Sequence, residues 1–322
     1  MKPGIVIAIA IAAFTAAASQ AQILRYPTKP IRIVVPSSPG GGLDLVARIV
    51  GQQLTYAWGQ IVIVDNRAGA GGTIGPEFVA KSAPDGHTLL IASATFAVNP
   101  SVYANLPYDS VRDFAPVILA TSQPQVLVIH PSLPVRSIKE LVVLAKSRPG
   151  QLNYSSPGAG TLSQLTFELF KSVAGVKIEH VPYKGAGLSM VATLSGETQV
   201  STGSTVSVQS HLNSGKLRAL ATTGPLRSRA MPEIPTMAEQ GQPGATITGW
   251  YAFLAPAHTP RAIIDKLNAE TARILQLPDT REQLAREGSE LALGTPEQLG
   301  KHIATEIQRL GRIVKASGAA TQ

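Results

Sequence analysis

The sequence predicts an α/β fold with mainly parallel sheets, and three observations lead to this prediction. Apolar, β-rich runs alternate with helical patterns through most of the 322 residues, the pattern typical of strand–helix–strand units. Glycine-rich loops join a strand to a helix at two places more than 100 residues apart. The C-terminal portion changes to long amphipathic helical patterns. The length allows two hydrophobic cores rather than one.

The first 21 residues have the pattern of a secretory signal. Lys2 supplies a positive start, residues 5–18 are almost wholly apolar, and Ser19-Gln20-Ala21 is a small-x-Ala cleavage site. The apolar run is too short for a membrane span, and no later segment approaches 18 uninterrupted apolar residues. We therefore expect an exported, soluble protein that is cleaved near Ala21 and resides in the periplasm.

Composition excludes several classes of site. The chain has no cysteine, so disulfides, thiolate zinc sites and a lipid anchor on an N-terminal cysteine are ruled out. It has 28 Lys+Arg against 20 Asp+Glu, a net charge of +8, and loss of Lys2 with the signal leaves 27 − 20 = +7. This excess favours anionic ligands. The basic residues are scattered and only 5% of residues are aromatic, so we expect no nucleic-acid partner.

The first predicted unit after the signal runs from Ile31 to Gln53. Its first five residues are β-branched apart from Arg32, which indicates a buried strand. A Pro- and Gly-rich loop follows, and a helix is predicted to open at Asp44, which we expect to cap it. This order leaves several backbone N–H groups pointing outward, a site for a carboxylate or phosphate. A βα turn that binds nothing remains the alternative for this stretch alone.

The remaining elements follow in the same alternation. Ser137 and Glu140 form a capping box before one helix, and Gly175 is placed to end another. Further strands are predicted at Ile61–Val64, Thr88–Ala92, Val126–His130, Ile178–Val181 and Leu217–Ala221, and helices at Asp44–Tyr56, Ile74–Lys81, Ile138–Lys146 and Leu162–Val173.

A second strand–glycine loop–helix junction lies at residues 152–161. Two such junctions on two lobes could face each other across a cleft and hold a small anion through backbone donors from both sides. Thr259-Pro260 and Thr295-Pro296 each pair an N-cap with proline at the first helical position. The amphipathic helices that follow are expected to be structural.

The sequence contains no clear motif of an enzyme active site. The glycine loops do not match the dinucleotide fingerprint, and no Walker-type motif or G-x-S-x-G elbow occurs. The six histidines are isolated in sequence and form no metal-ligand spacing, so we expect no metal and no cofactor. Asp44 and Asp65 could form an acid/base pair. The preferred interpretation is that Asp44 caps its helix and that Asp65 lies in a turn. A Ser/His/Asp triad assembled from distant residues also stays open.

Several segments together resemble one family. They include YPTKPIRIVVP at residues 26–36, DNRAGAGG at 65–72, APDGHTLL at 83–90 and HVPYKG at 180–185. Further matching segments at 106–109, 146–154, 158–161, 215–220 and 254–257 extend the likeness over nearly the whole mature chain. On these residues the chain resembles the extracytoplasmic receptors of tripartite tricarboxylate transporters, the Bug receptors.

The resemblance implies a type II periplasmic-binding-protein fold, with two α/β lobes and a ligand cleft between them. Crossings between the lobes are expected near Ser122 and Gly249. The implied division is a signal at 1–21, lobe one at 22–121 plus 250–322, and lobe two at 122–249. Such receptors bind a small organic acid between the lobes and deliver it to the membrane permease subunits of the transporter. The resemblance implies a monomer without a cofactor.

The resemblance also implies the ligand-binding residues. Backbone amides and hydroxyl groups in the loops after the strands would hold the carboxylate oxygens. These residues are Pro39, Gly40, Gly41 and Asp44 in the first loop, Ser93, Ala94 and Thr95 after the third strand, and Ser156, Gly158, Gly160, Thr161 and Ser204 in lobe two.

One departure from the family pattern bears on the ligand. Family members carry aspartates in a stretch that reads ETQVSTGS here, so Gln199 and Gly203 stand where acids are usual. A pocket without that acid lacks a partner for an ammonium group, which makes an amino-acid ligand less expected. Two other functions remain alternatives: an exported hydrolase or lyase on a two-lobed α/β fold, and a subunit that presents its ligand to a sensor.

Overall fold

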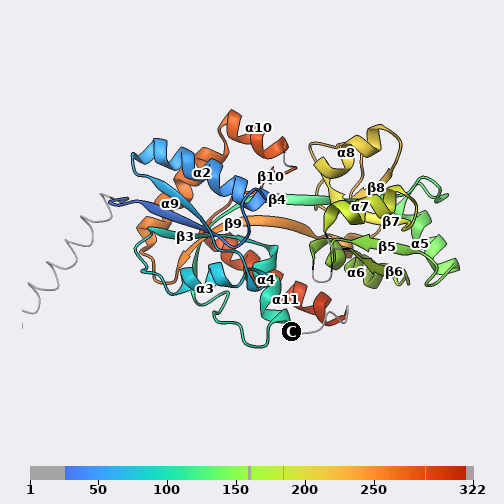
Figure 1. Ribbon diagram of the computed structural model, residues 1–322, viewed down its shortest axis with the longest axis horizontal. Helices are drawn as coiled ribbons and strands as arrows, with labels where there is room; N and C mark the ends of the chain where they lie inside the picture. The colour runs from blue at the N-terminus through green and yellow to red at the C-terminus, as the bar shows by residue number, and fades with distance from the viewer. Residues whose placement is uncertain (1–25, 159–160, 184, 287, 317–322) are drawn as a thin grey trace, which may run out of the picture.

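Two α/β lobes lie side by side in the computed structural model, which describes residues 26–158, 161–183, 185–286 and 288–316 (Figure 1). One sheet of ten strands runs through both lobes in the order β2-β1-β3-β9-β4-β7-β5-β6, with β8 and β10 also paired to β4. The two-lobed α/β fold predicted from the sequence is confirmed. No helix in the described part of the chain is long and apolar enough to cross a membrane.

The first half of lobe one consists of strand–helix units. Strands β1 and β2 are parallel, as are β1 and β3, so the loops at their carboxyl ends lie along one edge of the sheet. The elements are β1 (Ile31–Val35), α2 (Gly42–Trp58), β2 (Val62–Asn66), the short 3₁₀ helix η1 (Ala70–Gly72), α3 (Ile74–Ala80), β3 (Thr88–Ser93) and α4 (Ala94–Val102).

Two long antiparallel strands connect the lobes. These are β4 (Phe114–Ile129) and β9 (Thr248–Pro256), which pair with each other from Phe114–Pro256 to Pro124–Thr248. The sequence indicated only the last part of β4, because Pro116 and Pro124 interrupt its apolar pattern and proline is rare inside strands. The crossings predicted near Ser122 and Gly249 fall within these strands.

Lobe two lies between the two long strands in sequence. Parallel pairing of β5 with β6 and with β7 again brings the carboxyl ends of the strands to one edge. Its elements are α5 (Ile138–Ser147), β5 (Asn153–Ser156), α6 (Leu162–Ala174), β6 (Glu179–Pro182), α7 (Ala186–Leu194), β7 (Val200–Ser204), α8 (Thr205–Asn213), β8 (Arg218–Thr222) and the 3₁₀ turn η2 (Pro243–Ala245).

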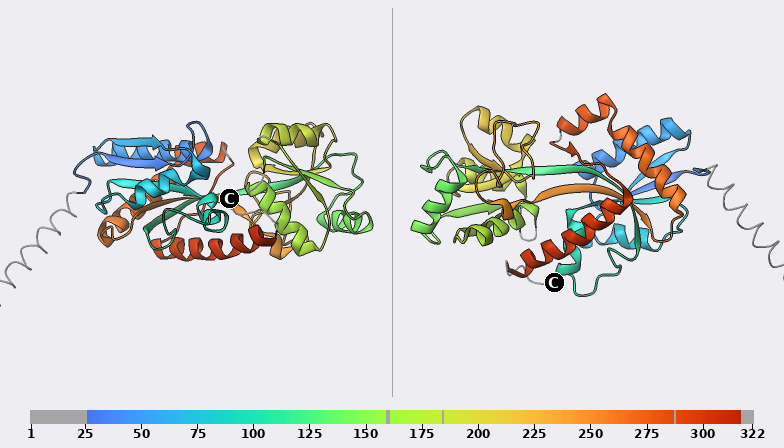
Figure 2. Two further views of the ribbon diagram at one scale, coloured as in Figure 1. Left: turned by 60° about the horizontal axis from the view of Figure 1, so that its bottom comes forward. Right: turned by 180° about the vertical axis from the view of Figure 1, so that it is seen from behind.

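The C-terminal portion is helical, as the amphipathic patterns predicted, and its helices pack mainly on the elements of lobe one. The helices are α9 (Arg261–Leu275), α10 (Pro278–Arg286) and α11 (Pro296–Ala316), with the short strand β10 (Glu290–Leu291) between the last two. Helix α9 packs on α2 and β4, whereas α11 packs on α4 and reaches α6 of lobe two. Figure 2 shows α11 running along the molecule beside the crossing strands.

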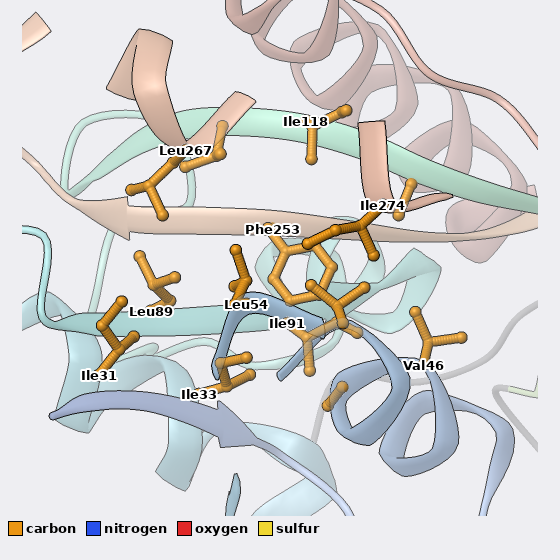
Figure 3. Close-up of a cluster of buried hydrophobic side chains, with 14 of the residues drawn as sticks. Ile31, Ile33, Val46, Leu54, Leu89, Ile91, Ile118, Phe253, Leu267 and Ile274 are labelled. Carbon is orange, nitrogen blue, oxygen red and sulfur yellow. The ribbon is translucent and has the colours of Figure 1, made fainter. Parts of the chain in front are cut away.

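Each lobe has a hydrophobic cluster of its own, and a further cluster joins Leu165 of α6 to β3, β9 and α11. One cluster of lobe one joins distant parts of the chain, for example Ile31 of β1, Phe253 of β9 and Ile274 of α9 (Figure 3). In lobe two, a cluster around Tyr154 and Phe167 has no member from β1 to β3. The boundaries 22–121, 122–249 and 250–322 remain a prediction.

Most of the predicted helix ends are confirmed. Ser137 accepts a hydrogen bond from the Glu140 amide at 3.1 Å, and Gly175 ends α6 in the left-handed conformation. Thr295 accepts from the amide of Gln298 at the start of α11. The cap predicted at Thr259 is wrong, since its hydroxyl donates to the Pro256 carbonyl and α9 starts one residue later than expected.

Candidate functional site

The first glycine loop is held by Asp44, although not as a helix cap. Helix α2 begins at Gly42 with Gly41 as its N-cap, so the predicted start at Asp44 is wrong by two residues. Gly42 itself forms the first residue of the helix. The buried Asp44 carboxylate instead accepts the Gly40 amide at 2.9 Å and the Arg48 guanidinium at 2.9 and 3.0 Å.

Asn66 completes this arrangement from the end of β2. Its side-chain amide donates to Asp44 at 2.9 Å and to the Ser37 carbonyl at 3.1 Å. Burial works to raise the pKa of Asp44, but the hydrogen bonds from Arg48, Gly40 and Asn66 outweigh it and lower the pKa to about 2. Asp44 is therefore ionised at neutral pH and fixes the loop. The Gly40 amide is committed to it and is not available to a ligand.

A cavity of about 190 Å³ is lined by residues on both sides of this loop, Ser37 before it and Leu43 after it. Leu43 in the first turn of α2 and Thr95 in the first turn of α4 both line it, so two helix N-termini converge there. Helix N-termini present unpaired N–H groups and a partial positive charge. The buried Ser37 hydroxyl, another lining group, has no hydrogen-bond partner among the described residues. The cavity thus offers donors and suits an anion.

Sequence reasoning missed the third wall of this cavity, formed by Gly71 and Gly72. Gly69, Gly71 and Gly72 all have positive φ, at 124°, 61° and 84°, a conformation that glycine adopts without strain. A Cβ on Gly71 would lie 1.9 Å from the hydroxyl oxygen of Tyr103. The sequence feature that could have indicated this wall is the presence of three glycines within four residues of the motif at 65–72.

The predicted residues of the second loop form a hydrogen-bonded cluster. The buried Ser156 hydroxyl accepts the Gly158 amide at 3.2 Å, and the Thr161 hydroxyl donates to the Gly158 carbonyl at 2.7 Å. Thr161 is also the N-cap of α6 and accepts from the Gln164 amide. Gly158 has φ +142°, which favours glycine. Gly160 lies outside the described residues.

His180 lies behind this loop. Its Nε2 is 2.7 Å from the Ser156 hydroxyl, and its Nδ1 is 3.4 Å from the Gln164 amide nitrogen. Burial lowers the pKa of His180. The serine–histidine pair does not offer a usable nucleophile, because Ser156 is 0% exposed and the group facing Nδ1 is an amide rather than a carboxylate. The pair therefore shapes the loop.

Ser204 lies at the same edge of the sheet as Ser156. The two strands that end at these residues, β7 and β5, are parallel neighbours, with Ser155 opposite Ser201. The Ser204 hydroxyl accepts the Ser207 amide at 3.2 Å and so caps α8. The structure thus places the described lobe-two residues along one edge, with their hydroxyl groups used mainly to cap helices and shape loops.

The starts of α2 and α6, one from each lobe, approach neighbouring positions of β9. A Cβ on Gly42 of α2 would lie 3.0 Å from the Tyr251 hydroxyl, and a Cβ on Gly249 would lie 3.0 Å from Leu162 of α6. Gly249 and Tyr251 are two residues apart, hence on the same face and separated by about 7 Å. Ser93 stands directly opposite Tyr251 in the β3–β9 ladder. Tyr251, like Gly71 and Gly72, was not selected from the sequence.

The arrangement can bind an anion through N–H and hydroxyl donors. Asp65 pairs with Arg32 and Arg67, and Asp44 pairs with Arg48. Both carboxylates are therefore committed to arginines, which argues against the acid/base pair considered from the sequence. Within the described ranges, no group of three or more His, Asp or Glu side chains could hold a metal ion.

Comparison with known proteins gives a consistent result. Residues 46–319 match the model of the tripartite tricarboxylate transporter family receptor. Protein BugT of Bordetella pertussis is 40% identical over 296 residues, 91% of each chain. The structure of R. palustris Rpa4515 with adipate is 34% identical with a TM-score of 0.75, covering 92% of this chain and 100% of that one. MatC from Rhodopseudomonas palustris with bound malate is 30% identical with a TM-score of 0.70, covering 90% and 100%.

Proposed function

This chain belongs to the tripartite tricarboxylate transporter receptor family, and from that premise we propose that it captures a small organic acid between its lobes and delivers it to the permease subunits of such a transporter. The proposed receptor acts as a monomer in the periplasm after cleavage near Ala21. Two similar solved structures carry adipate and malate, which supports a carboxylate as the ligand of this chain.

The observation that supports the proposal is that the starts of α2 and α6, one from each lobe, approach the same strand, β9. A Cβ on Gly42 of α2 would lie 3.0 Å from Tyr251, and a Cβ on Gly249 would lie 3.0 Å from Leu162 of α6. A carboxylate between them would receive N–H groups from lobe one and hydroxyl or amide groups from lobe two. Binding would then hold the lobes together across a common strand.

The residues divide into two roles in this proposal. The amides at the start of α2 and the groups of Ser93, Ala94 and Thr95 would meet the ligand, together with Ser37. Asp44 would act as a positioning residue, since its oxygens are occupied by the Gly40 amide, Arg48 and Asn66. The remaining predicted residues, Pro39, Gly41, Ser156, Gly158, Gly160, Thr161 and Ser204, are proposed to line the site or to shape its loops.

An amino-acid ligand is less compatible with these positions than a simple acid. Gln199 accepts the Asn153 amide at the amino end of β5, away from the proposed site. Gly203 is packed closely, and a Cβ there would lie 2.7 Å from Val208. Neither position holds a carboxylate for an ammonium group, and Asp44 is already paired.

The first experiment is a thermal-shift screen of the signal-free protein against mono-, di- and tricarboxylates, aromatic acids, amino acids and sugars. A ligand at 100 times its dissociation constant stabilises the folded state by about 2.7 kcal/mol. We expect a shift with one class of acid, and the acid recovered unchanged. A flat response to every acid would contradict the proposal, and turnover of a compound would favour the hydrolase or lyase alternative.

A glycine variant tests the loop model. Gly40 has φ +90° with open space around a Cβ, so Gly40→Val strains the backbone without a clash. We expect at least a tenfold loss of acid affinity by calorimetry. Gly241→Val is the matched control, because Gly241 has φ +82°, equally open surroundings and no place in the proposed site. Equal affinity in the two variants would contradict the loop model.

A further inference from the structure

A second cavity lies at the junction of the lobes, at one end of the crossing strands. It has a volume of about 650 Å³, within the range of small-molecule sites. Lobe two contributes Thr205 and residues 226–230, and the C-terminal part of lobe one contributes α10 and residues 288–293. Figure 1 shows α8 and β10 at this end of the boundary between the lobes. None of the residues proposed for the carboxylate site lines this junction pocket.

Two arginines of the junction pocket are unpaired. Within the part of the chain that the structure describes, the guanidinium groups of Arg229 and Arg281 have neither a hydrogen bond nor an ion pair. Two other charged lining residues are neutralised nearby, Arg227 by Glu239 and Glu282 by Arg286. The other charged groups described in the pocket are the guanidinium groups of Arg229 and Arg281 and one carboxylate.

That carboxylate belongs to Glu290. It accepts the Ser228 hydroxyl at 2.8 Å and the backbone amide of Arg229 at 3.0 Å, so both of its partners are neutral groups of lobe two. Among the described lining residues, two positive charges and one negative charge then remain without an oppositely charged partner. The excess of one positive charge fits a ligand with a single negative charge.

The rest of the wall is apolar with one buried donor. Leu226, Leu284 and Leu291 line the pocket, and Leu226 is 78% exposed. The hydroxyl of Thr205 is in the wall as well. Thr205 is only 1% exposed, and its hydroxyl has no hydrogen-bond partner among the described residues. An unsatisfied buried hydroxyl costs stability unless a ligand or solvent group meets it.

We propose that the junction pocket is a second ligand site, for a monoanionic organic acid with an apolar body. The acid group binds between Arg229 and Arg281, and the apolar body packs against Leu226, Leu284 and Leu291. Because the walls come from both lobes, a bound acid stabilises one relative arrangement of the lobes. Occupancy of this pocket and of the carboxylate site over β9 are then coupled, and the coupling is reciprocal.

The experiment is a fluorescence titration of the signal-free protein with 8-anilinonaphthalene-1-sulfonate, a monoanion with an apolar body. We expect saturable binding that weakens at least tenfold in Arg229→Gln and in Arg281→Gln, since a charge-assisted hydrogen bond is worth about a factor of ten or more. Both side chains are exposed, so the fold is retained, which circular dichroism checks. Arg148→Gln, at the exposed end of α5, is the matched control with unchanged affinity.

Two results would overturn the proposal: no saturable binding, or equal binding by the wild type and both arginine variants. The titration is made without the transported acid, so it does not depend on the carboxylate site, and Gly40→Val, which weakens acid binding there, should leave the probe titration unchanged. A probe that is displaced by the transported acid in the wild type and fails to bind Gly40→Val would mean that the probe occupies the β9 site instead, which also overturns the proposal.

Discussion

Asp44 shows how one buried side chain can fix a glycine-rich loop at the start of a helix. Its carboxylate is 3% exposed and gathers donors from Gly40, Arg48 and Asn66. An ionised group in this position is stable only because every oxygen is met by a donor. The side chain thereby converts a flexible glycine sequence into a fixed start of α2.

Replacing Asp44 with Asn tests this role. Asp44→Asn removes the charge that Arg48 and the Gly40 amide share, and we expect the free energy of unfolding to fall by about 2–3 kcal/mol. Acid affinity should fall as well, because the loop is released. Urea unfolding at pH 7 and calorimetry measure the two effects. Asp265→Asn is the control: its pair with Arg261 has the same spacing but is exposed, so a loss within about 0.5 kcal/mol is expected.

Two half-buried histidines, His180 and His302, make stability depend on pH. Burial lowers the pKa of both His180 and His302 below the ordinary value of 6.5. Folding thus favours the neutral rings, and their contribution is complete above pH 6.5 and is lost as the pH falls toward the lowered pKa values. We expect the unfolding free energy in urea to decrease between pH 7 and pH 5, and less steeply in His180→Gln or His302→Gln. Wild-type steepness in both variants would contradict this assignment.

At the scale of single elements, the capping box of α5 is the simplest test of a local rule. Ser137 accepts the Glu140 amide, and the Glu140 carboxylate accepts the amide of Arg136, one residue before the cap. Ser137→Ala should lower the unfolding free energy by about 1 kcal/mol, measured by urea unfolding. Ser147→Ala, which removes a hydroxyl bonded to the Leu144 carbonyl in the last turn, should cost less than half of that. A larger loss of unfolding free energy in Ser147→Ala than in Ser137→Ala would show that the cap contributes little.

The elements also show which parts of the fold local sequence can predict. Strand β1 and helix α6 were placed within one residue, because each has one clear period and a glycine or proline at its end. Helix α4 was missed since Pro100 lies inside it, and β4 was shortened because Pro116 and Pro124 lie within it. These elements depend on tertiary pairing: the middle of β4 is stabilised by β9 on one side, which no local pattern reveals.

The same distinction applies to the candidate site. The glycine loops at residues 39–41 and 156–161 could be predicted because glycine before a helix start is a local signal. The roles of Tyr251 and Ser37 could not, since Tyr251 reaches the loop of α2 only through the pairing of β3 with β9. The Ser37 hydroxyl belongs to the cavity because residues 71–72 and 92–96 fold against it.

The whole molecule is joined by a sheet that continues through both lobes, so we expect the lobes to unfold together. The two tryptophans, Trp58 and Trp250, both pack in the clusters of lobe one. Phe167 lies in lobe two, fully buried and stacked on Tyr154 at 4.2 Å. Phe167→Ala should lower the unfolding free energy by about 3–5 kcal/mol. The shift should appear equally in tryptophan fluorescence and in far-UV circular dichroism.

A fluorescence transition that stays at its wild-type position while the dichroism transition moves would contradict joint unfolding. Leu188→Ala, on the exposed side of α7 at 56% exposure, is the control and should leave both transitions within about 0.5 kcal/mol of wild type.

The route of the chain through the lobes has a consequence for biosynthesis. The lobe-one cluster that contains Ile31 also contains Ile274 and Leu284, so it is incomplete until almost the whole polypeptide has left the ribosome or the export channel. The lobe-two cluster around Phe167 uses only residues between Leu127 and Ala245 and has all its members earlier. The apolar surfaces of β1 and β3 therefore stay exposed to solvent while lobe two folds. During this interval the nascent chain most needs a chaperone.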